Sequence, residues 1–166
     1  MNGRRILVPV NLDQSAFDAL HFVAGLAGEM PVCATLLYVA ELNISAPERR
    51  VYDELSRENE RRLRSLAKLF FDGESPQVCV RLGKPHEEIL AEAESGQAEL
   101  IVMTSPKPSR AKWQIRRTTV ERVVRKAPCL TLVLPRAWKT TPEQYRRAMR
   151  PAFVPTSRSE FMEVNV

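Results

Sequence analysis

Residues 99–134 read ELIVMTSPKPSRAKWQIRRTTVERVVRKAPCLTLVL, and this stretch decides the fold. The largely apolar run Glu99–Met103 predicts a strand, and a long polar loop follows it. Thr118 then begins a helix, and the second apolar run, Leu130–Leu134, predicts another strand. A strand, a helix and a strand in this order predict a parallel βαβ unit, because parallel neighbours need a crossover connection.

The same alternation extends back to the start of the chain. Its apolar runs have no polar alternation, as expected of strands that helices cover on both faces. These further strands are predicted at Ile6–Val10, Val32–Val39 and Val78–Leu82. Helices are predicted after a cap at Asp13 or Ser15, from Pro47 to about Phe71, and from Pro85. The chain therefore predicts an α/β fold, an open five-stranded parallel sheet with helices on both faces.

Two segments of different character make up the chain of 166 residues. Residues 1–135 hold all the predicted strands and form one α/β domain. Residues 136–166 are a tail with three prolines, six basic and three acidic residues and little periodicity. A wholly disordered tail usually carries fewer aromatic residues, so this one is expected to be partly ordered or to dock on a partner. Its aromatic residues are Trp138, Tyr145, Phe153 and Phe161.

Composition limits the classes of partner and compartment. The three cysteines, Cys33, Cys79 and Cys129, have no metal-site spacing and are expected to be buried, reduced thiols.

No apolar run reaches the length that spans a membrane, so we expect a cytoplasmic protein without membrane contact. The net charge of +5 is a mild basic bias, and nucleic acid is not the expected partner. The charged face of the helix from Pro47 is expected to be a solvated surface with four-apart ion pairs.

No motif for catalysis or metal binding is present in the sequence. It contains no GxSxG, HExxH or Cys-x-x-Cys pattern, and His21 and His86 stand alone. We therefore expect no catalytic residue, no metal ligand and no enzymatic activity. An enzyme acting on a nucleotide or phosphorylated metabolite is an alternative, with Asp13 as the sole acid near the strand ends.

The loop before Thr118 resembles a phosphate site in position but not in composition. A strand that runs through a loop into a helix commonly holds phosphate, because the helix start offers free N–H groups. Glycines normally line such loops, yet all six glycines of the chain lie at or before Gly96. Lysine, arginine and proline fill the loop instead, and Thr118-Thr119-Val120-Glu121 predicts a capping box at the helix start.

Four segments together resemble the universal stress protein family, over residues 4 to 135. They are Ile6-Leu7-Val8-Pro9-Val10, Leu36-Leu37-Tyr38-Val39, Leu100-Ile101-Val102-Met103 and Glu121-Arg122-Val123-Val124-Arg125-Lys126-Ala127-Pro128-Cys129. The resemblance implies a fold like that of the adenine nucleotide alpha hydrolases, with strand order 3-2-1-4-5. It also implies a homodimer joined through the fifth strands. The implied dimer seam is Leu130, Thr131, Leu132, Val133 and Leu134, and Leu132→Lys is expected to give monomer or aggregate.

The resemblance further implies where a nucleotide would lie. ATP-binding members carry an aspartate after the first strand and a motif of Gly, two residues, Gly, nine residues, Gly and Ser or Thr. The aspartate position here holds Asn11, and the motif positions hold Thr104, Lys107, Arg117 and Thr118. All three glycines are therefore replaced. The implied nucleotide-site positions are Val10, Asn11, Val39, Met103, Thr104, Lys107, Arg117, Thr118 and Thr119.

These observations favour a dimeric stress-response regulator that does not bind ATP in the usual way and acts through partner proteins still unknown. No cofactor is assigned, although ATP stays open as a ligand. One alternative is a nucleotide-binding protein whose phosphate site is built from the side chains of Lys107, Arg117 and Thr118. Another is nucleic-acid binding by the basic loop, which would weaken steeply with salt.

Overall fold

The computed structural model describes residues 3–12, 16–41, 49–71, 73, 75–105 and 118–135. The predicted roles of the tail 136–166, of Lys107 and Arg117, and of Asp13 lie outside these residues. Strands and helices alternate strictly along the described chain, as the sequence predicts. They are β1 Arg4–Pro9, α1 Ala16–Glu29, β2 Val32–Ala40, α2 Arg49–Phe70, β3 Gln77–Leu82, α3 Pro85–Ser95, β4 Leu100–Thr104, α4 Thr119–Lys126 and β5 Leu130–Leu134.

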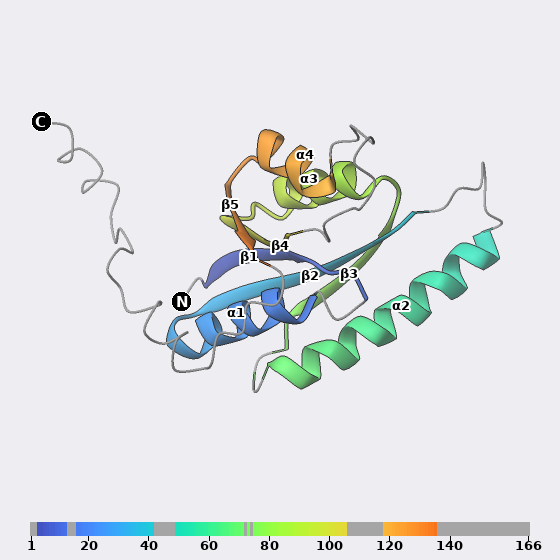
Figure 1. The fold of residues 1–166 in the computed structure, drawn as a ribbon. Helices are drawn as coiled ribbons and strands as arrows, with labels where there is room; N and C mark the ends of the chain where they lie inside the picture. Colours follow the sequence, from blue (N-terminus) through green and yellow to red (C-terminus); the bar gives the residue numbers. More distant parts are fainter. Residues whose placement is uncertain are drawn as a thin grey trace, which may run out of the picture.

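The five strands form one parallel sheet in the order β3-β2-β1-β4-β5, which confirms the predicted fold class. Figure 1 shows α1 and α2 on one face of this sheet and α3 and α4 on the other. β1 and β4 lie side by side although they are far apart in sequence, with Ile6 opposite Leu100. Winding therefore reverses between these two strands, which is where ligands bind in open α/β sheets.

Each face of the sheet buries its own apolar cluster. Between the sheet and the α1–α2 layer, Val8, Leu20 and Leu36 are fully buried. On the other face, Leu37 and Ile101 of the sheet pack with Val123 of α4. This two-sided burial explains the continuous apolar strands, because successive side chains of one strand enter opposite clusters.

The expectation of buried cysteines is wrong for Cys33, which is exposed. Cys33 is the second residue of β2 and pairs with Arg5 at the amino end of the sheet, and its side chain stays open to solvent. Cys79 and Cys129 are half-buried, and burial raises the pKa of both thiols. A raised pKa keeps a thiol protonated and a poor nucleophile.

An ion pair and a backbone contact fasten β1 to the start of β4. The Glu99 carboxylate accepts the Arg5 backbone N–H at 3.0 Å and the Arg4 guanidinium at 2.9 Å. These two contacts, the backbone one first, hold the pKa of Glu99 below its usual value. A lowered folded-state pKa gives stability that is present above the unfolded pKa and lost as pH falls through the folded value.

We expect Glu99→Gln to lower the free energy of unfolding at pH 7 by less than about 1 kcal/mol, because the pair is partly exposed to solvent. The difference from the unsubstituted protein should shrink as pH falls through the folded-state pKa of Glu99, because the carboxyl is then protonated in the folded protein as well as in the unfolded chain. Urea unfolding of both proteins at pH 7 and at a series of lower pH values measures this difference in the free energy of unfolding. A difference that grows towards acid pH would contradict this assignment.

Candidate functional site at the carboxyl ends of the strands

Seven of the nine predicted nucleotide-site positions fall within the described residues. Val10 and Asn11 follow β1 directly, and the Val10 N–H donates to the Leu37 carbonyl at 2.8 Å. Met103 and Thr104 end β4, where Thr104 lies opposite Leu134. The structure therefore places these residues at the carboxyl ends of their strands, as the sequence predicts.

The structure divides these positions between the two faces of the sheet, which the sequence analysis did not foresee. Val39 and Met103 belong to the cluster beneath α3 and α4. Val10 belongs to the cluster beneath α1, and strand alternation places Thr104 on that same side with Val102. Thr118 and Thr119 lie at the start of α4, on the α3–α4 side of the sheet. Of the predicted positions at the strand ends, only Val39 and Met103 lie on that same side.

Thr104 occupies the position of the first glycine of the family motif, and its backbone has the conformation of a β-strand. Gln97 is the only non-glycine residue with a positive φ in the described part of the chain, so Thr104 carries no such strain. Among the described residues, neither the buried Thr104 Oγ1 nor the buried Thr131 Oγ1 has a hydrogen-bond partner.

The predicted capping box at the start of α4 is confirmed. The Glu121 N–H donates to the Thr118 Oγ1 at 3.2 Å, and the Thr118 N–H donates to the Glu121 carboxylate at 3.1 Å. The chain thus supplies its own anion to the helix start, where the dipole favours negative charge. A phosphate held by the Thr118 amide would have to displace that carboxylate.

We expect Thr118→Ala to lower the free energy of unfolding by about 1 kcal/mol, because it removes the hydroxyl that accepts the Glu121 amide. Thr119→Ala is the matched control, since Thr119 lies one residue inside the helix and is no cap. Urea unfolding compares the two variants. Equal losses would contradict the capping role of Thr118.

Acidic and metal-ligating groups give little support to catalysis here. The sequence analysis missed Glu41, which follows β2 directly and is exposed at the same end of the sheet. The sequence could have indicated Glu41 as a residue of this end of the sheet, because it directly follows the apolar run of β2. His86 lies 3.4 Å from Arg122, and His21 stacks edge-on against Phe70. Within the described ranges, His, Cys, Asp and Glu form no group that could hold a metal ion.

β5 forms one edge of the sheet and presents apolar side chains there. Leu130 is 76% exposed, and Val124 on the neighbouring α4 is 50% exposed. The Ser105 N–H donates to the Leu134 carbonyl at 2.7 Å, so the backbone of Leu134 faces β4. By alternation, the backbone groups of Thr131 and Val133 face away from the sheet.

The opposite edge of the sheet is closed differently. Arg81 of β3 pairs with Glu92 and, at 3.4 Å, with Glu88 of α3. This charged edge strand discourages pairing with another strand. The two edges therefore differ, since β3 carries a charged side chain and β5 presents the exposed Leu130.

A groove of about 1120 Å³ lies at the amino ends of the strands, away from the predicted site. Arg5, Cys33, Phe70 and Gly96 are among its lining residues. The described nucleotide-site positions of β1, β2 and β4 lie at the opposite, carboxyl ends of these strands. Among the described residues, none of the predicted site positions lines this groove, and the two buried hydroxyls without a hydrogen-bond partner, Thr104 and Thr131, lie outside it.

Comparison with known proteins identifies one family. The family model described as the universal stress protein family matches residues 3–135. No curated protein sequence matches the chain.

Among the helices that the structure describes, none is both long and apolar enough to cross a membrane.

Solved structures share this fold at low sequence identity. Hypothetical protein MJ0577 is 24% identical, with a TM-score of 0.68 over 83% of this chain and 98% of its own. The universal stress protein UspA from Lactobacillus plantarum is 23% identical, with a TM-score of 0.61 over 80% and 99%. A universal stress protein family protein from Arabidopsis thaliana with AMP bound is 17% identical, with a TM-score of 0.53 over 86% and 98%.

Proposed function

Because the chain belongs to the universal stress protein family, we propose that it is a cytoplasmic stress-response regulator that acts as a homodimer and does not bind ATP in the usual way. Residues 1–135 form the regulatory domain in this proposal, and residues 136–166 dock on that domain or on a partner. The observation that carries the proposal is the loss of all three motif glycines.

The start of α4 supports the absence of ordinary ATP binding. Its Thr118 amide already donates to Glu121, and the first glycine position holds Thr104 with a side chain on the α1 side. Bulky, charged Lys107 and Arg117 occupy the other two glycine positions. Side chains at the Lys107 and Arg117 positions would block the close approach of backbone to phosphate that glycine allows.

The β5 edge supports a homodimer. β5 carries the exposed Leu130, and the backbone groups of Thr131 and Val133 in the same strand face away from the sheet. An open apolar edge strand invites aggregation unless something pairs with it. A two-fold axis through the edge would pair β5 with its copy and cover the open edge of the strand.

The alternative is a nucleotide-binding protein with a phosphate site made of side chains. The Arabidopsis thaliana protein with AMP bound and a universal stress protein in complex with cAMP have the same fold as this chain. In this alternative, Lys107 and Arg117 contact the phosphates directly. If this alternative holds, Lys107→Ala should weaken nucleotide binding. The main proposal expects no ordinary ATP binding to be measured in the first place.

Sedimentation velocity of the purified chain at micromolar concentration tests the proposed assembly. We expect a species of twice the 18.9 kDa chain mass. A monomer over the whole concentration range would overturn the homodimer, and with it the role assigned to β5.

A further inference from the structure

Five cations lie in a row along the outer side of α2. At 3.6 residues per turn they fall within a sector of about 60°, and no carboxylate of the helix lies in that sector. All five side chains are exposed. We call them the α2 cationic row: Arg50, Arg57, Arg61, Arg64 and Lys68.

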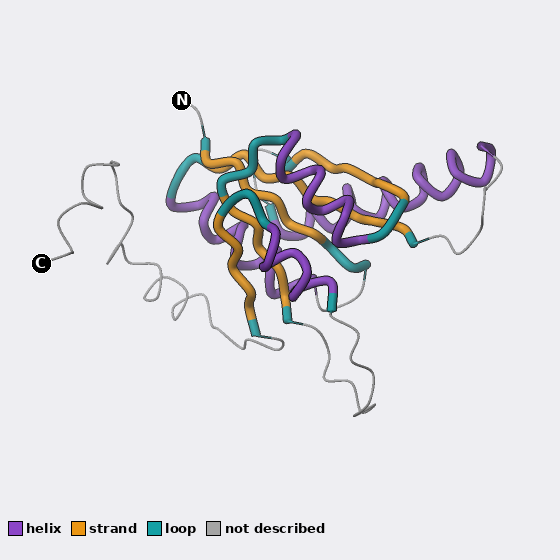
Figure 2. Tube along the Cα trace, turned by 90° about the horizontal axis from the view of Figure 1, so that it is seen from above, coloured by secondary structure: helices purple, strands orange, loops and turns teal. Residues whose placement is uncertain are grey.

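The row points away from the domain. Leu63 and Ala67, on another side of α2, are buried against the sheet. Figures 1 and 2 show α2 as an outer element whose amino end projects beyond the sheet. From Arg50 to Lys68 the row is about 27 Å long, because each helical residue rises about 1.5 Å.

The carboxylates of α2 do not cancel this charge. The helix carries seven cations and four carboxylates, so it holds three of the chain's five net positive charges. Two members of the row are paired, Arg61 with Glu58 at 3.4 Å and Arg64 with Glu60 at 2.5 Å, but the two arginine side chains are 76% and 61% exposed. Such solvated pairs contribute little and exchange readily for another anion. Within the described ranges, Arg57 and Lys68 form no ion pair.

We propose that the α2 cationic row binds the phosphate backbone of a nucleic acid duplex, without sequence preference. Neighbouring cations from Arg57 to Lys68 stand three or four residues apart, so they present charge every 4.5–6 Å or so along a straight rod. Arginine offers paired donors that match phosphate oxygens. The row holds no aromatic side chain on which unpaired bases could stack, which favours a duplex over a single strand.

This surface differs from both earlier expectations about charge. The sequence analysis treated the charged face of this helix as solvated and placed any nucleic-acid contact in the basic loop. The row lies on the α1–α2 layer, which packs on β3, at the opposite edge of the sheet from β5. The proposed homodimer therefore leaves it open on both copies.

Fluorescence anisotropy with a labelled mixed-sequence duplex of about 20 base pairs tests the proposal between about 50 and 200 mM salt. We expect saturable binding whose affinity falls linearly with salt on logarithmic axes. Arg57→Gln with Arg61→Gln should reduce that slope by about 1.8 and lower affinity tenfold to a hundredfold at about 100 mM salt. Glutamine preserves the helix, which circular dichroism verifies.

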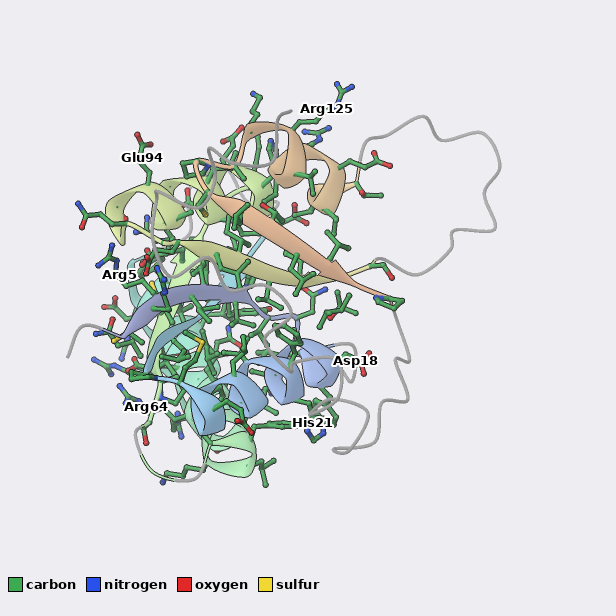
Figure 3. All side chains as sticks on the ribbon, turned by 90° about the vertical axis from the view of Figure 1, so that its left-hand side faces the viewer. Arg5, Asp18, His21, Arg64, Glu94 and Arg125 are labelled. Carbon is green, nitrogen blue, oxygen red and sulfur yellow. The ribbon has the colours of Figure 1, made fainter. Side chains whose placement is uncertain are left out.

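Arg125→Gln with Lys126→Gln is the matched control, because it removes the same charge from α4. Figure 3 shows Arg125 and Arg64 on different sides of the molecule. The control should stay within twofold of the unsubstituted protein. Equal losses in both variants, a loss in the control alone, or no duplex binding by folded protein at about 50 mM salt would overturn the proposal. Binding to vesicles with anionic lipid but not to the duplex would overturn it as well.

Discussion

If the proposed homodimer forms through β5, Val133→Pro is expected to convert it to a folded monomer, weakening self-association roughly a hundredfold or more. The Val133 N–H faces away from β4, because the neighbouring Leu134 carbonyl accepts the Ser105 N–H. Proline at this position therefore removes no hydrogen bond within the sheet. In a β5–β5 seam it removes one donor from each copy and leaves the facing acceptors unpaired. Sedimentation equilibrium measures the change.

Val133→Ala is the matched control, since it shortens the side chain but keeps the N–H. It should remain dimeric, with self-association weakened by about tenfold at most. Leu132→Lys is a poorer probe, because Leu132 packs against the core beneath α1 and a lysine there would also destabilise the monomer. An unchanged dimer in Val133→Pro would refute the seam through β5.

The second large effect is a gain of function. Restoring the family motif with Asn11→Asp, Thr104→Gly, Lys107→Gly and Arg117→Gly should create saturable, one-per-subunit ATP binding. Glycine removes the side chains that obstruct the phosphates, and aspartate restores a charged acceptor after β1. We expect a gain of at least a hundredfold in affinity, measured by calorimetric titration with magnesium present.

The same aspartate combined with alanine at the three glycine positions is the control. Alanine removes the long and charged side chains but keeps a Cβ atom, so it should bind ATP much more weakly than the glycine variant. Each glycine costs about 0.5–1 kcal/mol of stability, so thermal unfolding must verify that both variants are folded. A folded glycine variant that binds no ATP would show that the glycines do not account for the lost site.

The sequence predicted the sheet well because its signals are local or periodic. Unbroken apolar runs indicated buried parallel strands, and the three-residue spacing of Thr118 and Glu121 indicated the capping box. Strand ends were displaced by one or two residues, since pairing decides them. β1 begins at Arg4 because that residue lies opposite Val32.

The site was harder to predict because burial and face depend on tertiary structure. Nothing in the apolar run around Cys33 shows that the side chain is left open at the end of the sheet. Val39 and Met103 lie on one face of the sheet, and Val10 and Thr104 lie on the other. This division follows from strand alternation, so it could have been predicted from the sequence. The α2 cationic row also required a helical projection of residues that the sequence shows only as scattered charges.

Calorimetric titration of the purified, nucleotide-free chain with ATP and magnesium at physiological salt tests the central claim most directly. The account predicts no saturable heat from folded protein, because side chains replace all three motif glycines and Glu121 occupies the start of α4. Saturable binding at micromolar affinity, one nucleotide per subunit, would contradict it and would show that Lys107, Arg117 and Thr118 have rebuilt the phosphate site.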